Sequence, residues 1–215
     1  MKSPGLMCRL VALLGISAGV LATPVGAQGC PELVGSYDTP GEPWGVALAG
    51  SYAYVADGFA GLRVIDVSNP AAPFEVGFVD TVEAFGVAVA GAYAYVADTT
   101  AGLRVVDVSN PAAPVEVGFY DTPGWAYGVA VAGSYAYVGD GGAGLRVVDV
   151  SNPALPFEVG SYDTPGFAYG VAVAGSYAYV GDGGAGLEVL TSCEGLLFQD
   201  SFESGDTSAW SATVP

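Results

Sequence analysis

One segment of about 42 residues recurs four times along this chain of 215 residues. Four aspartates stand at matching positions of the copies, separated by steps of 41, 42 and 42 residues: Asp57, Asp98, Asp140 and Asp182. A repeat of this length is typical of proteins built from stacked or radially arranged units, each too small to bury its own apolar face. The chain is therefore expected to fold as one repeat domain.

Each copy contains four short segments rich in Val, Tyr and Ala, separated by turn residues. In the third copy we predict strands at residues 128–132, 135–139, 144–151 and 157–163. The turns contain Gly and Asn, which accept positive φ, and Pro, which cannot pair further, and no helical period competes. The sequence predicts an all-β fold in which each copy is a four-stranded antiparallel sheet, the blade of a β-propeller.

A short motif marks the third predicted strand of each copy. It reads LRVID at Leu62–Asp66 and LRVVD at Leu103–Asp107 and Leu145–Asp149, each followed by Val-Ser-Asn-Pro, and it departs to LEVLT at 187–191. The motif resembles the LVIVD repeat of exported bacterial and archaeal surface proteins. The resemblance covers residues from about 33 to 190 and implies a propeller-type repeat without an assigned chemistry.

The N-terminal stretch explains why the last copy is short. Residues 30–38 align with the fourth strand of the third copy, whereas the last copy has three strands and ends near Leu190. We therefore predict a four-bladed β-propeller of four-stranded antiparallel blades, its ring closed by the N-terminal strand joining the last blade. A half-ring that dimerises into eight blades is the alternative, because four blades make a tight circle.

Two cysteines flank this predicted closure. Cys193 aligns with Ser151 and Cys30 with Leu155, so they stand on either side of the gap that residues 152–154 bridge in an intact copy. A pair of cysteines in an oxidising compartment indicates a structural bridge, and we predict a disulfide between Cys30 and Cys193. Two free thiols, or a lipid attached to Cys30, are the alternatives.

Residues 1–27 have the pattern of a removable export signal. Lys2 and Arg9 precede an apolar run over residues 10–22, and Val-Gly-Ala at 25–27 offers small residues for cleavage. The apolar run is too short to span a bilayer, and a signal anchor is the alternative. We expect a secreted, periplasmic or cell-surface protein with no membrane insertion after signal removal.

The rest of the chain is divided into a repeat domain and a tail. Residues 28–194 are assigned to the propeller. Residues 195–215 have a different composition and are too few to form a core, so a flexible tail or an added edge strand is expected there.

Charged side chains are few and unbalanced. The formal net charge is −17, histidine is absent, and three cations remain after the signal: Arg63, Arg104 and Arg146. Such a surface repels phosphate, which excludes nucleic acid as a partner. The lack of histidine, and of lysine beyond the signal, removes His-based triads, His-ligated metal sites and Schiff-base chemistry.

Side chains that recur in every copy are expected to serve the fold. Aspartates before Val-Ser-Asn-Pro can hold the turn by accepting N–H bonds, and the arginines can form ion pairs between strands or blades. The aspartates are Asp66, Asp107 and Asp149. The turns that begin at Asp57, Asp140 and Asp182 are predicted hairpin turns, and a calcium site is the weaker alternative because each supplies one carboxylate. No metal or other cofactor is predicted.

Aromatic residues vary between copies in the connection that precedes each innermost strand. They are Trp44, Phe85, Trp125, Tyr127, Phe167 and Tyr169. A propeller gathers such positions around one mouth of its channel, beside the Asp-Gly turns. A face that is aromatic and acidic suits sugars or cations, and the alternative is that these rings pack against each other and plug the channel.

The sequence predicts a non-enzymatic exported module for binding or structural interactions at the cell surface. Its expected ligand is a surface glycan or a protein, and a monomer is expected, with a dimer possible. A carboxylate-based glycoside hydrolase is the alternative, since two acids can suffice for that chemistry. Glu42 and Glu83 are its candidates because, unlike most acidic residues of the chain, they do not recur in every copy.

Overall fold

The computed structural model describes residues 32–193, and the fold lies within the second of two compact units, Val34–Pro215, the first being Met1–Leu33. The predicted signal, Cys30 and the predicted tail lie outside the described residues. The described residues form an all-β fold. Among them, no helix is long and apolar enough to cross a membrane.

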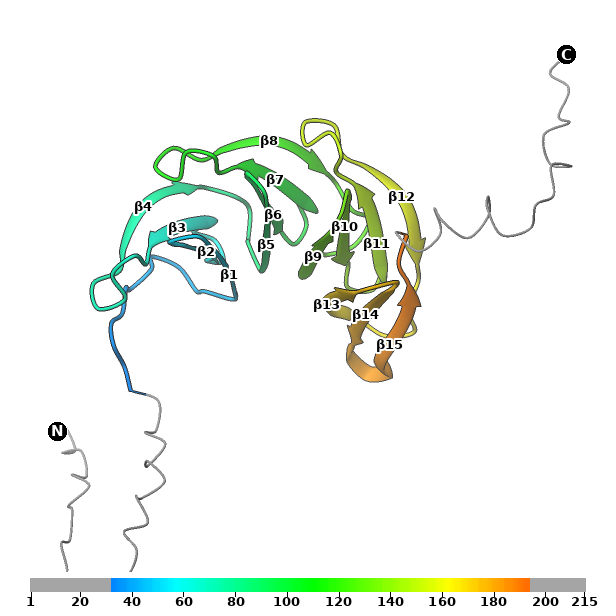
Figure 1. Ribbon diagram of the computed structural model, residues 1–215. Helices are drawn as coiled ribbons and strands as arrows, with labels where there is room; N and C mark the ends of the chain where they lie inside the picture. Colours follow the sequence, from blue (N-terminus) through cyan, green and yellow to red (C-terminus); the bar gives the residue numbers. More distant parts are fainter. Residues whose placement is uncertain (1–31, 194–215) are drawn as a thin grey trace, which may run out of the picture. The chain divides into compact units, whose positions relative to one another are not determined.

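Four antiparallel sheets follow one another along the chain, one for each copy of the repeat (Figure 1). The first contains β1 (Gly45–Ala49), β2 (Tyr52–Ala56), β3 (Leu62–Asp66) and β4 (Phe74–Val79). The second contains β5 (Gly86–Ala90), β6 (Tyr93–Ala97), β7 (Leu103–Asp107) and β8 (Val115–Tyr120). The third contains β9 (Gly128–Ala132), β10 (Tyr135–Gly139), β11 (Leu145–Asp149) and β12 (Phe157–Tyr162). The fourth has three strands, β13 (Ala168–Ala174), β14 (Tyr177–Asp182) and β15 (Gly186–Thr191), with a 3₁₀ turn, η1 (Gly183–Ala185), before the last.

The predicted propeller-like blades are confirmed, and most strand bounds agree. β9 and β10 begin and end at the predicted residues, and β12 ends one residue early. β11 is shorter at both ends than the predicted 144–151. Gly144 has a φ of 78°, in the left-handed region that glycine favours, and it belongs to the turn before β11. At the other end, the chain turns as soon as Asp149 accepts the N–H of Ser151.

A β-bulge bends the outer strand of each complete sheet. In the third sheet the register shifts between Val147 and Val148, opposite Gly160, and the first two sheets repeat the shift at the same position. The outer-strand glycine at this position lets the next sheet approach. A Cβ on Gly118 would collide with the carbonyl oxygen of Pro153 in the turn of the third sheet. The bulge and the glycine together bring the blades into contact.

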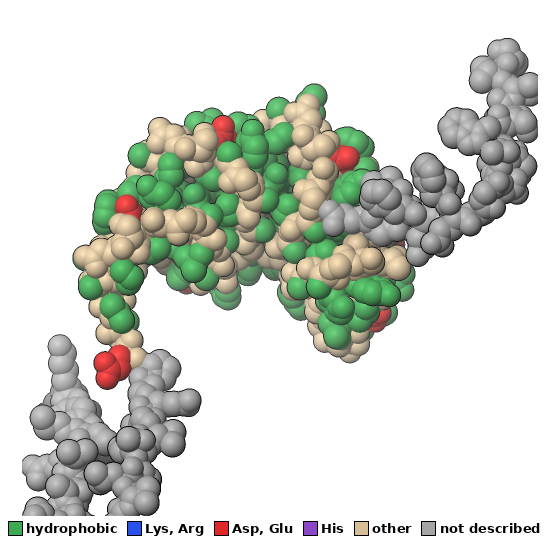
Figure 2. All heavy atoms as spheres, viewed as in Figure 1, with side chains coloured by type: hydrophobic (Ala, Val, Ile, Leu, Met, Phe, Trp, Pro, Cys, Tyr) green, Lys and Arg blue, Asp and Glu red, His purple; other side chains and the backbone are tan. Residues whose placement is uncertain are grey.

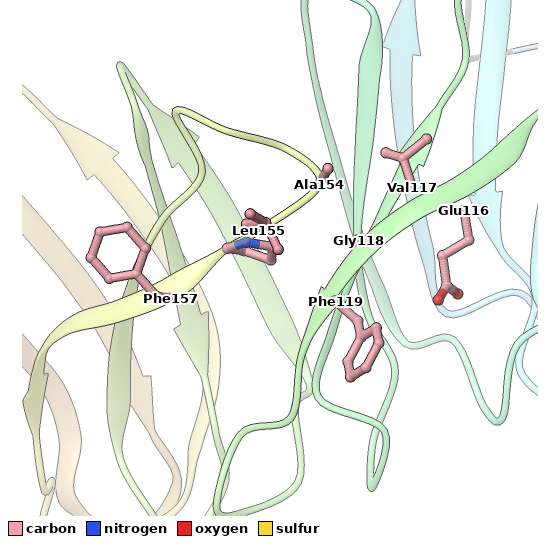
Figure 3. Close-up of a pocket in the computed structure, with 8 residues that line it drawn as sticks. Glu116, Val117, Gly118, Phe119, Ala154, Leu155 and Phe157 are labelled. Atoms are coloured by element: carbon pink, nitrogen blue, oxygen red, sulfur yellow. The ribbon is translucent and has the colours of Figure 1, made fainter.

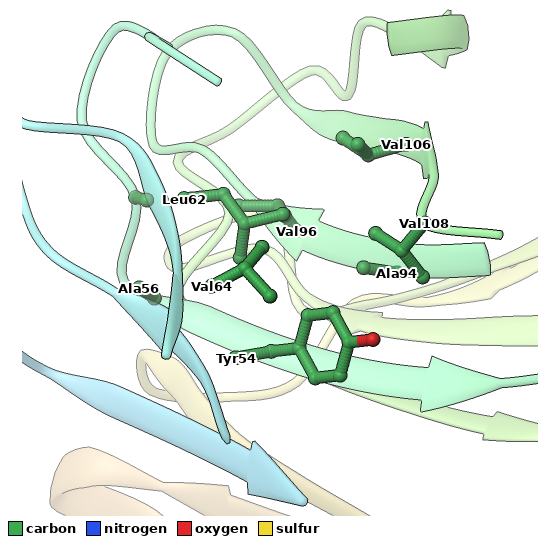
Figure 4. Packing of buried hydrophobic residues seen from close by; sticks show 9 residues of the cluster. Tyr54, Ala56, Leu62, Val64, Ala94, Val96, Val106 and Val108 are labelled. Atoms are coloured by element: carbon green, nitrogen blue, oxygen red, sulfur yellow. The ribbon is translucent and has the colours of Figure 1, made fainter. Parts of the chain in front are cut away.

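Neighbouring sheets bury an apolar core between their faces. Between the first and second sheets, Tyr54, Leu62 and Val64 point toward Val96 and Val106 (Figure 4). The second and third sheets, and the third and fourth, form corresponding clusters from residues at the same repeat positions. Because successive side chains along a strand point to opposite faces of the sheet, each sheet packs one face against the sheet before it and the other face against the sheet after it.

The predicted ring closure is not what the structure shows. The inner strands β1, β5, β9 and β13 lie side by side in this order along an arc, and the first and last sheets stay apart at its two ends (Figure 1). The last sheet keeps three strands, so no described segment pairs with the outer edge of β15. The three similar interfaces set a curvature that leaves the ends of the arc separate.

The segment at residues 34–38 lies beside the first sheet instead. A Cβ on Gly35 would collide with the carbonyl oxygen of Pro70, just as one on Gly77 would collide with that of Pro111. Gly77 is in the outer strand of the first sheet, packed on the turn of the second. The segment thus occupies the place of an outer strand that belongs to a sheet preceding the first.

Candidate functional site

The six predicted aromatic residues come together in one continuous row. One member from each copy precedes the glycine of an inner strand, and these glycines pack so closely that a Cβ on Gly45 would lie 2.6 Å from the Phe85 carbonyl oxygen. The close approach stacks Trp44 on Phe85, with ring centroids 4.8 Å apart and planes 12° apart. Phe85 meets Tyr127 edge-on at 5.3 Å, and Tyr127 meets Tyr169 at 5.1 Å.

Trp125 and Phe167 form a second tier on this row. Trp125 lies 6.5 Å from Tyr127 at a 65° interplanar angle, and Phe167 stacks 6.2 Å from Tyr169. The rings therefore pack on one another, as the alternative interpretation expected. Four of the rings nevertheless stay about half exposed, Trp44, Trp125, Phe167 and Tyr169, with Trp125 at 57%, whereas Phe85 and Tyr127 are partly buried. Burial raises the pKa of Tyr127, and the neighbouring Tyr169 and Glu83 raise it further.

Two pockets adjoin Trp125, one between the second and third copies of the repeat and the other between the third and fourth. The smaller has a volume of about 210 Å³ and the larger about 450 Å³. The smaller is lined by Glu83, Phe85, Thr99, Thr100, Trp125 and Tyr127. The larger is lined by Pro123, Gly124, Trp125, Gly142, Ala143 and Phe167. Trp125 is common to both, so it is the central residue of the candidate site.

Thr99 is a member of the smaller pocket that sequence reasoning missed. Its φ is 37°, and it is the one non-glycine residue with positive φ among the described residues. The other copies have glycine at this position: Gly58, Gly141 and Gly183. Thr99 is 4% exposed, and its Oγ1 has no hydrogen-bond partner among the described residues. The replacement of Gly by Thr in one copy was the available sequence signal.

The Asp-Gly turns do neighbour the aromatic row, as expected, but their carboxylates point inward. The aspartate that opens each of these turns is buried, and it accepts a hydrogen bond of 2.5 to 2.7 Å from a threonine of the preceding connection. These aspartates are Asp57, Asp98, Asp140 and Asp182. Backbone N–H groups bind them as well, such as Gly124 to Asp140 at 2.7 Å. Burial raises the pKa of Asp140, partly offset by the hydrogen bonds from Thr122 and Gly124. These carboxylates hold the connections in place, and the described residues contain no cluster of three metal-ligating side chains.

The other recurring charges serve the fold, as predicted. The Arg146 guanidinium lies 2.9 Å from Asp163 and 3.8 Å from Glu158, and the other two arginines form equivalent pairs within their own sheets. Asp66 holds its turn by accepting the Ser68 N–H at 2.8 Å. Hydrogen bonds from the Ser68 hydroxyl and backbone lower the pKa of Asp66.

A rim groove, which the sequence did not predict, lies between the second and third sheets (Figure 3). Its volume is about 550 Å³, and it is lined by Glu116, Val117, Gly118, Phe119, Ala154, Leu155, Pro156 and Phe157. Its lining residues belong to the outer strands and the Asn-Pro turn. Because both features recur in the repeat, this groove reflects how any two blades meet.

Cys193 carries a free thiol in the structure, and its predicted partner Cys30 lies outside the described residues. The N–H of Cys193 donates to the Tyr137 hydroxyl at 3.0 Å, which fixes the end of the last sheet against the third. Burial raises the pKa of the Cys193 thiol. No disulfide is seen at Cys193, and the bridge stays a prediction because Cys30 lies outside the described residues.

Comparison with known proteins agrees with this architecture. Two computationally designed proteins share the fold: Ika4, with a TM-score of 0.60 at 10% identity, covering 76% of this chain and 99% of that one, and Ika8, with a TM-score of 0.57 at 8% identity, covering 70% of this chain and 46% of that one. No curated protein matches the sequence. The LVIVD repeat matches residues 40–81, 83–122, 123–164 and 165–190. The chain thus belongs to the LVIVD-repeat family.

Proposed function

We propose that this protein is an exported, non-enzymatic binding module that binds a neutral glycan on its aromatic row. The observation that carries the proposal is the position of Trp125, half exposed between two pockets within that row. Aromatic planes stack on the apolar faces of sugar rings, and a concave site with few polar groups fixes their orientation. In the smaller pocket the hydroxyl of Thr99 and the carboxylate of Glu83 are such groups.

A cationic ligand is less well supported than a sugar. The aspartates nearest the row are buried and already bind threonine and backbone N–H groups. An anionic glycan is also disfavoured, because the three described arginines are engaged in ion pairs within their sheets. Stacking with a few hydrogen bonds remains as the main source of affinity, which favours an uncharged sugar chain.

Glycoside hydrolysis requires two carboxyl groups on opposite sides of the scissile bond. Glu83 is the one carboxylate among the residues lining the smaller pocket, and the larger pocket has none among its lining residues. Glu42 belongs to the first connection, near Gly58, and it lines neither of the two pockets. The binding role is therefore the better supported of the two.

Replacing Trp125 tests the proposal. The chain from residue 28 onward is screened against neutral polysaccharides and oligosaccharides, and the dissociation constant is measured by calorimetry. Trp125→Ala should weaken binding by about tenfold or more, as expected for a central aromatic contact. Phe119→Ala is the matched control, because Phe119 is similarly exposed but lines the rim groove.

Three outcomes would contradict the proposal. Equal losses in both variants would place the ligand elsewhere, and unchanged affinity in Trp125→Ala would remove the site. Release of sugar that stops in Glu83→Gln would show a hydrolase.

We also infer that Cys30 and Cys193 form the disulfide that the alignment indicates, at the place where a chain end meets the last sheet. Cys193 lies at that end, beside Gly160 of β12. Whether the bridge forms within one chain or between two depends on how the arc is completed.

A further inference from the structure

The two ends of the arc expose the two halves of one recurring interface. In the first three sheets the leucine that opens the third strand is almost completely buried against the next sheet, with Leu62 at 0% and Leu145 at 3% exposure. Its counterpart in the last sheet, Leu187, is 66% exposed. We call this surface the last end face, formed by Tyr177, Leu187 and Val189. In the earlier sheets the matching residues are covered by the next sheet, and no described sheet covers this face.

The first sheet shows the opposite half of the same interface. Val87 and Val89 of β5 pack against the first sheet, whereas their counterparts in β1 are exposed, Val46 at 67% and Leu48 at 72%. We call Val46 and Leu48 the first end face. Apolar side chains also cover much of the surface seen in Figure 2. Two complementary apolar surfaces of this kind, at opposite ends of one arc, indicate an interaction with each other.

The unpaired strands show the same complementarity. The last sheet lacks an outer strand at β15, and residues 34–38 occupy the place of an outer strand with no sheet of its own. In the third sheet Gly160 pairs with Val147 and Tyr162 with Leu145. By the repeat alignment, Gly35 would pair with Val189 and Tyr37 with Leu187.

We propose that two copies of this chain join head to tail, closing one ring of eight sheets. Each copy packs its first end face on the partner's last end face, and residues 34–38 of each complete the partner's last sheet. One chain does not close by itself, because three similar interfaces leave its ends apart (Figure 1). Two copies supply eight blades, within the usual range for propellers, whereas three would supply twelve. A head-to-tail interface that closes after two copies satisfies both pairs of ends.

The junction between the two chains of the dimer is expected to be weaker than the interfaces between sheets of one chain. Within the chain, Gly58 exchanges two backbone hydrogen bonds with Ala84, of 2.9 and 3.0 Å, and Thr99 and Gly141 do the same with later connections. Pro43 stands at the matching position of the first connection and has no N–H to donate. The dimer is therefore expected to dissociate reversibly on dilution when Cys30 and Cys193 are kept reduced, and the tests below use reducing conditions.

Solution mass and shape test the proposal. Light scattering on the chain from residue 28 onward should give twice the mass of one chain, and X-ray scattering should give a closed ring. Leu48→Asp and Leu187→Asp should each yield folded monomers, with the dissociation constant raised by about a hundredfold or more. Leu155→Asp is the control, because Leu155 is 71% exposed on the rim, away from both end faces, and should stay dimeric.

Mixing the two end variants distinguishes a head-to-tail ring from other arrangements. A Leu48→Asp chain retains a native last end face, and a Leu187→Asp chain retains a native first end face. The mixture should therefore form an open dimer through one native junction, although neither variant dimerises alone. Loss of dimer in only one of the two variants would indicate an interface between like ends and would overturn the proposal.

Hydrogen exchange gives a second readout that does not depend on any substitution. Amides of β15 should be protected in concentrated wild-type protein and should exchange faster on dilution, because the partner's strand covers that edge. A wild-type protein that stays monomeric at all concentrations, with β15 protected throughout, would show that the chain closes on itself and would overturn the proposal.

Discussion

At the scale of single residues, Thr99 combines a stability cost with a role in the candidate site. It holds a positive φ of 37° and a buried hydroxyl without a described partner. We predict that Thr99→Gly raises the free energy of unfolding by about 1 kcal/mol, because left-handed backbone is costly for a β-branched residue and an unpaired buried hydroxyl adds to that cost. The same variant should bind the glycan more weakly. Chemical denaturation and calorimetry measure the two effects.

Thr100→Gly is the control for this substitution, since Thr100 is exposed and has no positive φ. It should bring no gain in stability. A loss of stability in Thr99→Gly would mean that the threonine is favoured by its surroundings and would contradict the prediction. The sequence showed that Thr99 departs from the repeat, but its burial beside Trp125 depends on how two blades meet, which no single copy reveals.

At the scale of the element, the outer strand depends on the glycine at its bulge. Gly118 packs on the backbone of Pro153 and Ala154 in the next sheet, with no room for a Cβ. We predict that Gly118→Ala lowers the free energy of unfolding by about 1–3 kcal/mol, the usual cost of overpacking. Thermal and chemical denaturation measure it.

Gly142→Ala is the matched control, because its Cβ would lie 3.8 Å from the nearest atoms, those of the Phe167 ring. It should change stability little, and equal losses in both variants would show that the bulge position has no special role. Strands such as β9 and β10 were predictable because each is a short run rich in Val, Ala and Tyr bounded by clear turn residues. The bulge was not predictable, because it reflects contact with another sheet.

At the scale of the whole molecule, the curvature of the arc decides how the chain ends meet. The alignment of residues 30–38 with an outer strand identified a missing partner, but the choice between one chain and two depends on the angle between packed faces. Sequence patterns do not report that angle. The repeat alone therefore allowed both a closed ring and a half-ring.

The cysteines provide a covalent test at this scale. If two copies form the ring, Cys30 of each chain bonds to Cys193 of the other, and exported protein should run as a covalent dimer under denaturing, non-reducing conditions. Cys193→Ser should give single chains in that measurement, and reduction should do the same to wild type. A single chain with an internal bridge, or two free thiols per chain, would contradict the prediction.

The similarity of the three interfaces also has an evolutionary consequence. Each sheet contacts only its neighbours, and each presents the same two faces to them. Recombination between near-identical stretches of the gene that removed or added one whole copy would create a junction of the same kind as those already present. Descendants of this gene can therefore change their number of copies without new residues having to arise, and ring size becomes a trait that varies in whole steps.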